Sequence, residues 1–317
     1  MVSPIGLGCW QFSQGHGLAG KFWGMMTDDE VLEVVRLSLE GGINWFDTAE
    51  AYGWGASERA LARALKALGK APGEVVVATK WHPLLRTARS IPKTVGARIE
   101  CLGGYPIDLF QVHSPLSFSS IEAQMAAMAR LVEDGMIRSV GVSNFSARQM
   151  RKAHASLARR GLRLVSNQVR YSLLDREIET NGVLDAAKEL GVSIIAYSPL
   201  AQGILSGKFH ADPSLARRKP GFRKYMGAFK PRGLERSRPL IEALRGVAAK
   251  HGVTSSQVAL NWVVAVHGDS VVAIPGASSP AQAAENAGAL GFTLAGEDIE
   301  LLDRASRPDK TLPNGAG

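Results

Sequence analysis

Short runs of apolar and β-branched residues recur along this chain, with longer mixed segments between them. Within each run the apolar residues follow one another without alternating with polar ones, which indicates strands buried on both faces. Strands of this kind are typical of parallel sheets covered by helices. The sequence predicts eight of them: Ile5–Trp10, Ile43–Thr48, Val75–Trp81, Ile107–His113, Ile137–Asn144, Leu164–Tyr171, Val192–Pro199 and Val271–Ala277.

The segments between the predicted strands carry helical signals. Thr27 and Glu30 have the spacing of a capping box, and the apolar pattern behind them ends at Gly41-Gly42. Ser57–Leu68 repeats leucine and alanine at helical spacing, which indicates one buried face. Further helices are predicted at Ser120–Met136, Ser146–Arg160, Leu184–Leu190, Leu234–Lys250, Ser255–Val266 and Pro280–Leu290.

Strands that alternate with helices over short connections predict right-handed βα units. Eight such units in 317 residues favour an α/β fold, a (β/α)8 TIM barrel with extra helices that forms one domain over residues 1–317. An open doubly wound sheet is the alternative. That fold normally has fewer strands and a glycine-rich first turn, whereas Gly8 is followed here by Cys9-Trp10 and not by a glycine that opens a helix.

One segment, Phe209–Arg238, interrupts the alternation after the seventh strand. Its prolines and glycines predict a long loop, and loops of this length in a compact domain often cover or bind a ligand. The segment holds nine Lys and Arg residues against Asp212 and Glu235, a net charge of +7 within a chain total of +8. We expect this basic loop to lie beside a bound phosphate; the alternative is a solvated surface insert.

Composition narrows the class of protein. A hydrophobic fraction of 45% excludes a mostly disordered chain, and no apolar run approaches the ~20 residues of a membrane span. The N-terminus has neither the basic nor the apolar region of a secretory signal. Two cysteines, Cys9 and Cys101, suit a reducing cytoplasm. Because the positive charge is concentrated in one loop, we expect neither a nucleic-acid nor a membrane partner.

Polar residues follow the ends of the predicted strands. Asp47 and the nearby Tyr52 follow the second strand, Lys80 ends the third and His113 ends the fourth. Each has an ordinary structural explanation when taken alone, as a cap, a solvated cation or a packed ring. Because active sites of barrels lie at the carboxyl ends of the strands, we expect these four side chains to converge.

The four side chains together have the chemistry of a proton donor to a carbonyl oxygen. A lysine ammonium stabilises phenolate, so Lys80 is expected to lower the pKa of Tyr52 from about 10. Asp47 would keep Lys80 charged, and His113 would hydrogen-bond the carbonyl. Neither a G-x-S-x-G nor an H-E-x-x-H motif occurs, so no serine nucleophile and no metal are predicted.

Carbonyl reduction also needs a hydride, which no side chain supplies, so a nicotinamide cofactor is predicted. Tyr197 is expected to stack on the nicotinamide ring. Ser143, Asn144 and Gln168 are expected to bond its carboxamide. The helix that follows Ser278 would hold a phosphate at its N-terminus.

These residues, in this order, resemble the aldo-keto reductase superfamily over nearly the whole chain. The segment Asp47-Thr48-Ala49-x-x-Tyr52-Gly53, with Lys80 and His113, matches the tetrad of that family. The chain looks most like the bacterial branch related to potassium-channel beta subunits. Further segments that match the family are Gly141–Phe145, Asn167-Gln168, Ala196–Ala201 and Ile274–Ser278.

The resemblance implies an enzyme that reversibly reduces aldehydes or ketones, with NADP(H) preferred and NAD(H) as the second option. It implies that Tyr52 is the general acid/base, that Lys80 tunes it, and that Asp47 and His113 hold Lys80 and the carbonyl. The alternative is a cofactor-binding regulatory subunit with slow turnover, similar to the channel subunits. The cofactor residues implied are Ser143, Asn144, Gln168, Tyr197, Ser198, Pro199, Leu200, Gly203, Lys208, Arg223, Gly276, Ser278, Gln282, Glu285 and Asn286.

The chain departs from the family pattern at two places. Many relatives have a Lys or Arg after the Pro-Gly-Ala turn, where this chain has Ser278-Ser279, and we expect Arg223 of the basic loop to supply the missing charge. Relatives also usually begin earlier, with a β-hairpin under the barrel. Here Met1 lies almost on the first strand, so we expect either that the hairpin is missing or that the start of the chain was trimmed.

The substrate pocket is expected where aromatic residues follow the first three strands. Trp10, Trp54, Trp81 and His82 are the residues predicted to wall an apolar or aromatic pocket for a small carbonyl or alcohol. The alternative is that these rings are part of the ordinary core.

Overall fold

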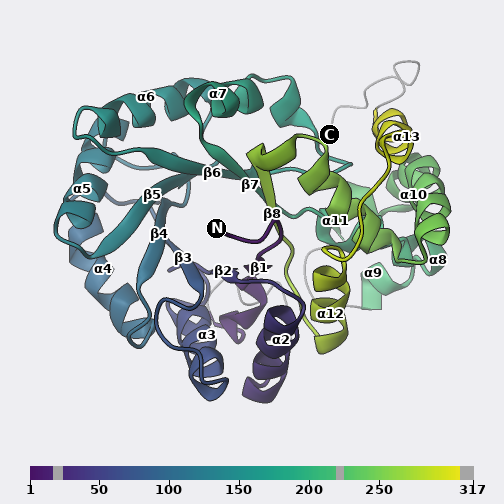
Figure 1. Ribbon diagram of the computed structural model, residues 1–317, viewed down its shortest axis with the longest axis horizontal. Coiled ribbons are helices and arrows are strands. Elements are labelled where there is room, and N and C mark those ends of the chain that lie inside the picture. The colour runs from purple at the N-terminus through teal and green to yellow at the C-terminus, as the bar shows by residue number, and fades with distance from the viewer. Residues whose placement is uncertain (17–23, 219–224, 308–317) are drawn as a thin grey trace.

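Eight parallel strands stand side by side in chain order and close on themselves (Figure 1). The computed structural model describes residues 1–16, 24–218 and 225–307. Bridges from Ile5 to Ala273 and from Gly8 to Gly276 join the first strand to the last. The predicted (β/α)8 barrel is therefore confirmed, and the doubly wound alternative is excluded. The strands are β1 (Leu7–Gly8), β2 (Trp45–Asp47), β3 (Val76–Trp81), β4 (Ile107–Val112), β5 (Ile137–Ser143), β6 (Leu164–Arg170), β7 (Ser193–Tyr197) and β8 (Val271–Ile274).

Helices follow the strands and form an outer ring (Figure 1). The predicted capping box is present, because Thr27 accepts from the Glu30 backbone and Glu30 accepts from that of Thr27. The α-helices are α2 (Asp28–Glu40), α3 (Ala56–Ala67), α4 (Ser90–Cys101), α5 (Ile121–Glu133), α6 (Ala147–Ala158), α7 (Val183–Leu190), α8 (Lys208–Ala211), α9 (Leu215–Arg218), α10 (Pro231–His251), α11 (Ser255–Ala265), α12 (Pro280–Gly288) and α13 (Gly296–Ser306). The 3-10 helices are η1 (Trp10–Ser13), η2 (Glu177–Glu179), η3 (Ala201–Ser206), η5 (Gly227–Phe229) and η6 (Gly268–Ser270).

The barrel has one apolar core between strands and helices and a smaller one inside the strands. The inner core consists of Trp45, Ala78, Leu109, Ile195 and Ile274. A Cβ atom on Gly6 would overlap the Trp45 indole, so only glycine lets the chain enter β1 across that ring. The described residues before β1 form no hairpin. Instead the Trp45 indole donates to the Ser3 carbonyl at 2.9 Å, which holds the chain start against β2.

Two helices and part of the basic segment differ from the prediction. The sequence pattern missed α4 and α13, because α4 contains Pro92 and Gly96 and has only three buried residues, and α13 only two. Phe209–Arg238 is not one long loop, since α8, α9 and η5 occupy parts of it and α10 begins at Pro231. Proline suits a first helical position because its missing N–H is not needed there.

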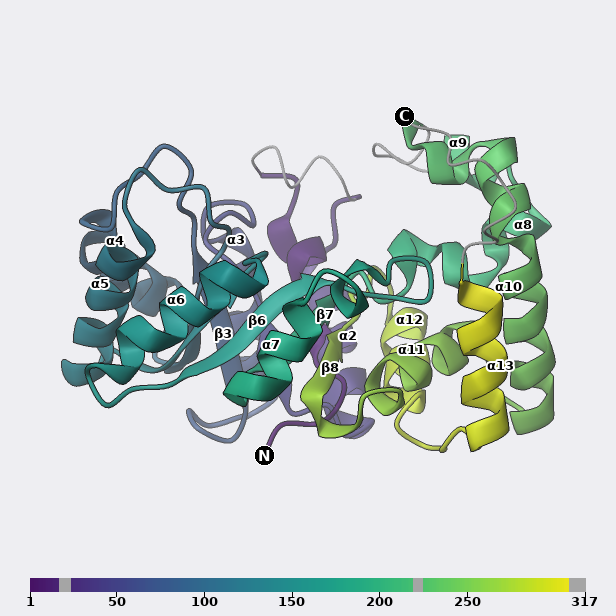
Figure 2. The same cartoon turned by 90° about the horizontal axis from the view of Figure 1, so that it is seen from above.

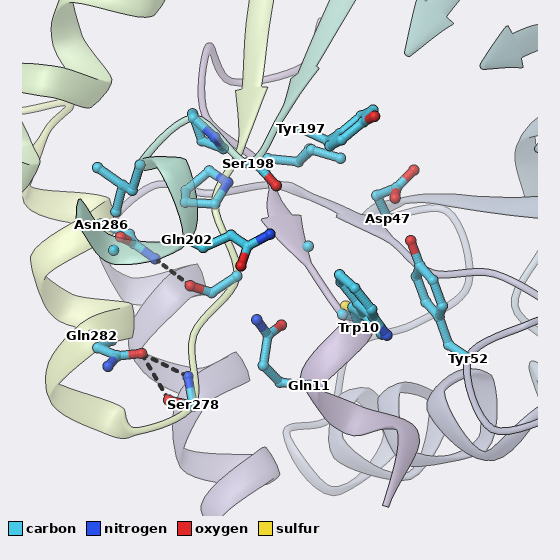
Figure 3. A pocket seen from close by; sticks show the side chains of 18 of the residues that line it. Trp10, Gln11, Asp47, Tyr52, Tyr197, Ser198, Gln202, Ser278, Gln282 and Asn286 are labelled. Carbon is cyan, nitrogen blue, oxygen red and sulfur yellow. Dashed lines mark hydrogen bonds between the residues drawn. The ribbon is translucent and has the colours of Figure 1, made fainter. Parts of the chain in front are cut away.

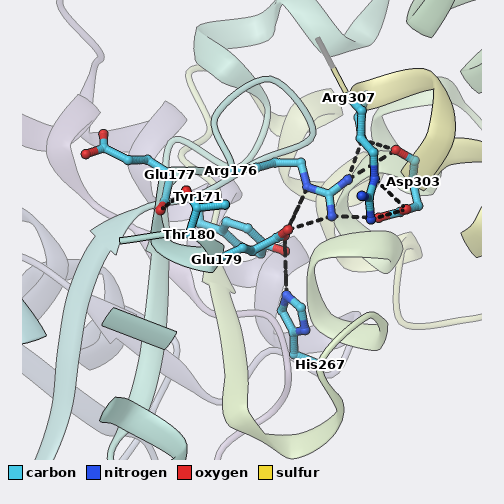
Figure 4. Close-up of polar contacts among 9 residues, drawn as sticks. Tyr171, Arg176, Glu177, Glu179, Thr180, His267, Asp303 and Arg307 are labelled. Carbon is cyan, nitrogen blue, oxygen red and sulfur yellow. Dashed lines mark hydrogen bonds and ion pairs between the residues drawn. The ribbon is translucent and has the colours of Figure 1, made fainter. Parts of the chain in front are cut away.

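α10 and α13 lie side by side outside the ring of barrel helices (Figures 1 and 2). No helix within the described ranges is long and apolar enough to cross a membrane. A polar network joins α13 to the segment after β6 (Figure 4). Arg176 donates to Glu179 and to Asp303 at 2.6 Å each, and its guanidinium lies 5.0 Å from the Trp262 ring centre. The network therefore ties the C-terminal helix to the barrel.

Glu179 is the centre of this network. Its carboxylate also accepts from the Tyr171 hydroxyl at 2.6 Å, and His267 lies 3.4 Å away. Burial opposes ionisation of Glu179, but hydrogen bonds from His267, Arg176 and Tyr171 outweigh it and lower its pKa to about 2. Folding thus favours the ionised form, and this stabilisation is present above the ordinary pKa and is lost as the pH falls toward 2.

Glu179→Gln should lower the free energy of unfolding by on the order of 3 kcal/mol at pH 7, because folding lowers the pKa of this carboxyl from 4.5 to about 2. At pH 4 the deficit should shrink by roughly 1 kcal/mol, because wild type has begun to lose the same stabilisation. Urea unfolding at both pH values measures this, with the exposed Glu177→Gln as the control. A deficit that does not change with pH would contradict the assignment.

Candidate active site

Four side chains converge at the carboxyl ends of the strands. Asp47 ends β2, Lys80 lies in β3 and His113 follows β4 directly. Tyr52 lies in the loop between β2 and α3. Its ring is 5.7 Å from that of His113, and the Lys80 ammonium is 5.0 Å from its ring centre. The structure thus brings together the four residues that the sequence placed on one rim.

Asp47 and Lys80 form a buried ion pair beneath the other residues. Both side chains are almost fully excluded from solvent, at 1% and 0% exposure. Gln111 and Gln168 each donate to the Asp47 carboxylate at 2.9 Å. Lys80 also donates to the Thr48 carbonyl at 2.9 Å. Burial disfavours the ammonium, but Asp47 and Tyr52 outweigh it, so the pKa of Lys80 is raised and Lys80 stays charged.

Tyr52 is enclosed between Trp10 and His113. The Trp10 ring stacks on it at a centroid distance of 6.0 Å and an angle of 19°. Burial raises the pKa of Tyr52, and the charge of Lys80 lowers it by a smaller amount. Lys80 therefore acts on this pKa in the expected direction, but the net shift is upward because the loss of solvation outweighs the lysine. Tyr52 is consequently a neutral phenol at pH 7.

His113 is neutral as well. Burial, the charge of Lys80 and the neighbouring His82 together hold its pKa well below the usual range. A neutral imidazole can donate a hydrogen bond through one ring nitrogen and accept through the other. His113 is therefore suited to bond a neutral polar group in front of Tyr52.

Buried hydrogen bonds fix the loop that carries Tyr52. The Thr48 hydroxyl donates to Ser57 at 2.8 Å, and Ser57 donates to the Cys9 carbonyl at 2.7 Å. Glu50 accepts from the backbone N–H of His82 at 3.0 Å, which joins the loop after β2 to the loop after β3. The position of Tyr52 is thus set by contacts on several sides.

A long cleft of about 980 Å³ runs from Tyr52 and His113 to α12. In Figure 3, Asp47, Tyr52 and Trp10 lie at one end, and Ser278, Gln282 and Asn286 lie at the other. Lys80 lies under the cleft and does not line it. The predicted cofactor residues that line it are Ser143, Asn144, Gln168, Tyr197, Ser198, Pro199, Leu200, Gly203, Lys208, Gly276, Ser278, Gln282, Glu285 and Asn286.

Left-handed backbone recurs along one wall of the cleft. Asn144, Ser198 and Gln202 line the cleft and have φ values of 59°, 52° and 55°. Such conformations are strained for residues other than glycine, and they cluster at ligand clamps. The Tyr197 hydroxyl donates to the Asn144 side chain at 3.1 Å, which links two segments of this wall.

The far end of the cleft is built around the start of α12. Ser279 caps the helix by accepting from the Gln282 backbone. The Gln282 side chain accepts from the Ser278 backbone N–H at 2.9 Å, and Asn286 donates to the Gly276 carbonyl at 3.3 Å. These bonds hold the turn after β8 against a helix N-terminus, which favours an anion.

Two glutamines that line the cleft were not predicted from the sequence as site residues. Gln11 lies in η1 and Gln202 in η3, and their amides face one another in the middle of the cleft (Figure 3). Gln11 is 7% exposed, and its carbonyl oxygen has no hydrogen-bond partner among the described residues. The sequence signal was available for Gln11, since it directly follows the first predicted strand, where the barrel rule places site residues.

Several predicted residues do not lie where they were expected. Trp81 is fully buried in the main core and donates to Ser90 at 3.0 Å, so it cannot wall a substrate pocket. Trp54 is exposed beside the cleft, with its ring 6.1 Å from His82. Trp10 and His82 line the cleft as expected.

The basic segment does not reach the cleft through the part of it that the structure describes. Arg217, Arg218, Lys230, Arg232, Arg236 and Arg238 are absent from the cleft lining. Arg218 instead pairs with Asp212, and Arg238 with Glu235. Arg223, expected against a phosphate, lies outside the described residues together with Lys219 and Lys224.

The known proteins that the chain matches agree with one another, and the matches extend over nearly the whole chain. The sequence matches the family model described as "Aldo/keto reductase family" over residues 4–307. An uncharacterized oxidoreductase of Mycobacterium bovis is 37% identical over 315 residues, covering 99% of this chain and 92% of its own. Chloroplastic pyridoxal reductase of Arabidopsis thaliana is 35% identical, covering 96% and 84%. The structure of a glycerol dehydrogenase from Gluconobacter oxydans is similar, with a TM-score of 0.83, 28% identity and coverage of 100% and 96%.

The buried ion pair gives a test of the site's construction. Asp47→Asn or Lys80→Met alone should lower the free energy of unfolding by about 3–5 kcal/mol, because each leaves an uncompensated buried charge. The double variant should lose clearly less than the sum of the two. Denaturant unfolding of the four proteins gives the coupling energy. Additive losses would mean that the two residues do not act as a pair.

Proposed function

We propose that this chain, which belongs to the aldo/keto reductase family, is an NADP(H)-dependent oxidoreductase that reversibly reduces aldehydes and ketones to alcohols. The observation that carries the proposal is the neutral Tyr52 phenol, held between Lys80 and His113 at one end of a long cleft. The names of two relatives, a pyridoxal reductase and a glycerol dehydrogenase, support interconversion of carbonyl and alcohol.

The cleft suits a dinucleotide together with a small substrate. Its volume of about 980 Å³ is at the upper end of the range for ligand sites and exceeds the needs of a small carbonyl compound alone. The unpartnered oxygen of Gln11 and the strained wall at Ser198 and Gln202 fit a bound polar ligand between them. When bound, the nicotinamide supplies the hydride.

The protein's own part in the reaction is to orient the carbonyl and supply a proton. His113 would bond the carbonyl oxygen, and Tyr52 would give its hydroxyl proton to the oxygen as negative charge develops there. Lys80 would stabilise the phenolate left behind, and Asp47 keeps Lys80 charged. In the oxidation direction Tyr52 takes the proton back.

We further propose that Ser143, Asn144 and Gln168 bind the carboxamide, that Tyr197 stacks on the nicotinamide, and that the start of α12 lies at the adenosine end. A preference for NADP(H) over NAD(H) is proposed through Arg223, which lies outside the described residues; Lys208 in the cleft would lie along the pyrophosphate, which both cofactors have. We also propose that the protein functions in a reducing compartment such as the cytoplasm, because Cys9 and Cys101 are free thiols.

Tyr52→Phe should reduce kcat for aldehydes by about 10²–10⁴-fold, the usual contribution of a general acid, while NADPH binding stays close to wild type. Stopped-flow NADPH oxidation and fluorescence titration measure the two quantities. Tyr105→Phe, which removes a hydroxyl bonded to the Lys70 carbonyl, is the matched control. Unchanged turnover in Tyr52→Phe would disprove the acid assignment. A wild type that binds NADPH but never oxidises it with reactive aldehydes would support the regulatory-subunit alternative.

The pH dependence of aldehyde reduction follows from the shifted pKa values of Tyr52 and His113. Reduction needs protonated Tyr52, whose pKa lies above 10, and neutral His113, whose pKa lies well below 6.5. We therefore expect kcat/KM to stay level from pH 6 to 9 and to fall only at higher pH. An inflection between pH 6 and 7 that disappears in His113→Gln would contradict this account.

A further inference from the structure

Gln111 is a buried glutamine that the proposed reaction does not use. It lies near the end of β4, is fully excluded from solvent and does not line the cleft. Its side-chain amide donates to the Asp47 carboxylate at 2.9 Å and accepts from the Gln168 amide at 3.3 Å. Burying an amide inside a barrel costs free energy that its hydrogen bonds must offset. The role of Gln111 therefore lies with these two partners.

The two oxygens of Asp47 have different partners. Oδ1 accepts from the Lys80 ammonium, and Oδ2 accepts from the amides of both Gln111 and Gln168. Because both oxygens act as acceptors, an amide beside Oδ2 must present its NH2 group and not its oxygen. Asp47 thus sets the orientation of the two glutamine amides.

Gln168 is left with one polar side-chain atom that is not in use. Its NH2 group donates to Asp47 at 2.9 Å and to the Gln111 oxygen at 3.3 Å, which uses both N–H bonds. The amide oxygen of Gln168 has no hydrogen-bond partner in the described part of the chain, and Gln168 lines the cleft. A ligand in the cleft would therefore meet an acceptor at this residue.

Gln111 holds the Gln168 amide from a second side. If that amide turned over, its oxygen would face the Asp47 carboxylate and the Gln111 oxygen, and both hydrogen bonds of the NH2 group would be lost. A single acceptor would allow the amide to tilt, whereas two acceptors for the same nitrogen leave one orientation. Because the network is buried, water cannot replace a missing partner, and a wrong orientation is costly.

We propose that Gln111 is a positioning residue of the cofactor site, which together with Asp47 turns the Gln168 amide so that its oxygen accepts from the NH2 group of the nicotinamide carboxamide. The proposal rests on the proposed function, because it takes Gln168 as a carboxamide ligand. Asp47 then serves both parts of the reaction. It pairs with Lys80 on one side and, through the two glutamines, orients the nicotinamide on the other.

Binding of NADP⁺ and of its 3-acetylpyridine analogue, in which a methyl group replaces the carboxamide NH2, tests the proposal. Quenching of the fluorescence of Trp10, which lines the cleft, gives both dissociation constants without a substrate. In wild type we expect NADP⁺ to bind about fivefold more tightly, the usual contribution of one hydrogen bond. Gln111→Met should bring this ratio close to one, because the Gln168 amide is then able to turn. Gln124→Met, at a buried glutamine of α5 that donates to the Ser119 carbonyl at 2.9 Å, is the matched control and should keep the wild-type ratio.

The ratio of the two affinities is the readout, because a purely structural loss would weaken both nucleotides alike. If Gln111→Met does not fold, Gln111→Asn should give the same low ratio, since its shorter amide cannot reach both Asp47 and Gln168. A wild-type ratio near one, or a Gln111 variant that keeps the wild-type ratio, would overturn the proposal. Aldehyde reduction with NADPH would in that case leave the proposed function intact. If neither nucleotide binds, the proposed function fails and the role of Gln111 fails with it.

Discussion

The buried Asp47–Lys80 pair is the interaction on which the site depends. An ammonium or a carboxylate left without a partner at this depth would strongly destabilise the fold. The two side chains pair with each other, Gln111 and Gln168 donate to the carboxylate, and the Thr48 carbonyl accepts from the ammonium. The pair also links strands that are neighbours in the barrel, since Asp47 lies on β2 and Lys80 on β3. The same contact therefore joins two barrel strands and holds the lysine that acts on Tyr52.

The pKa values of Tyr52 and His113 depend in part on the charge of this pair. A fixed positive charge under Tyr52 opposes the effect of burial on the phenol, and the same charge helps to keep His113 neutral. The site thus holds a neutral acid, Tyr52, and a neutral hydrogen-bonding group, His113, next to the charged Lys80. Such an arrangement can stabilise the negative charge that develops on a substrate oxygen during the reaction, because the positive charge of Lys80 is already in place.

Much of this could be predicted from the sequence because strand order fixes geometry in a parallel barrel. Continuous apolar runs gave the eight strands, and the barrel topology placed Asp47, Lys80 and His113 at one end. What could not be predicted depends on packing in three dimensions. Trp81 and Trp54 look alike in sequence, yet one points into the helix-covered core and the other into solvent. The pKa of Tyr52 depends on how far burial outweighs one lysine, which spacing does not encode. α4 was missed because its proline and glycine interrupt the helical pattern.

Tyr52 is a neutral phenol whose ionisation is eased by Lys80. Ultraviolet difference titration of Tyr52, taken as wild type minus Tyr52→Phe, measures it directly, and the same pair is compared in a Lys80→Met background. We expect the pKa of Tyr52 to lie above 10 in wild type and to be higher still without the lysine. A wild-type pKa below 9, or one that Lys80→Met leaves unchanged, would contradict it.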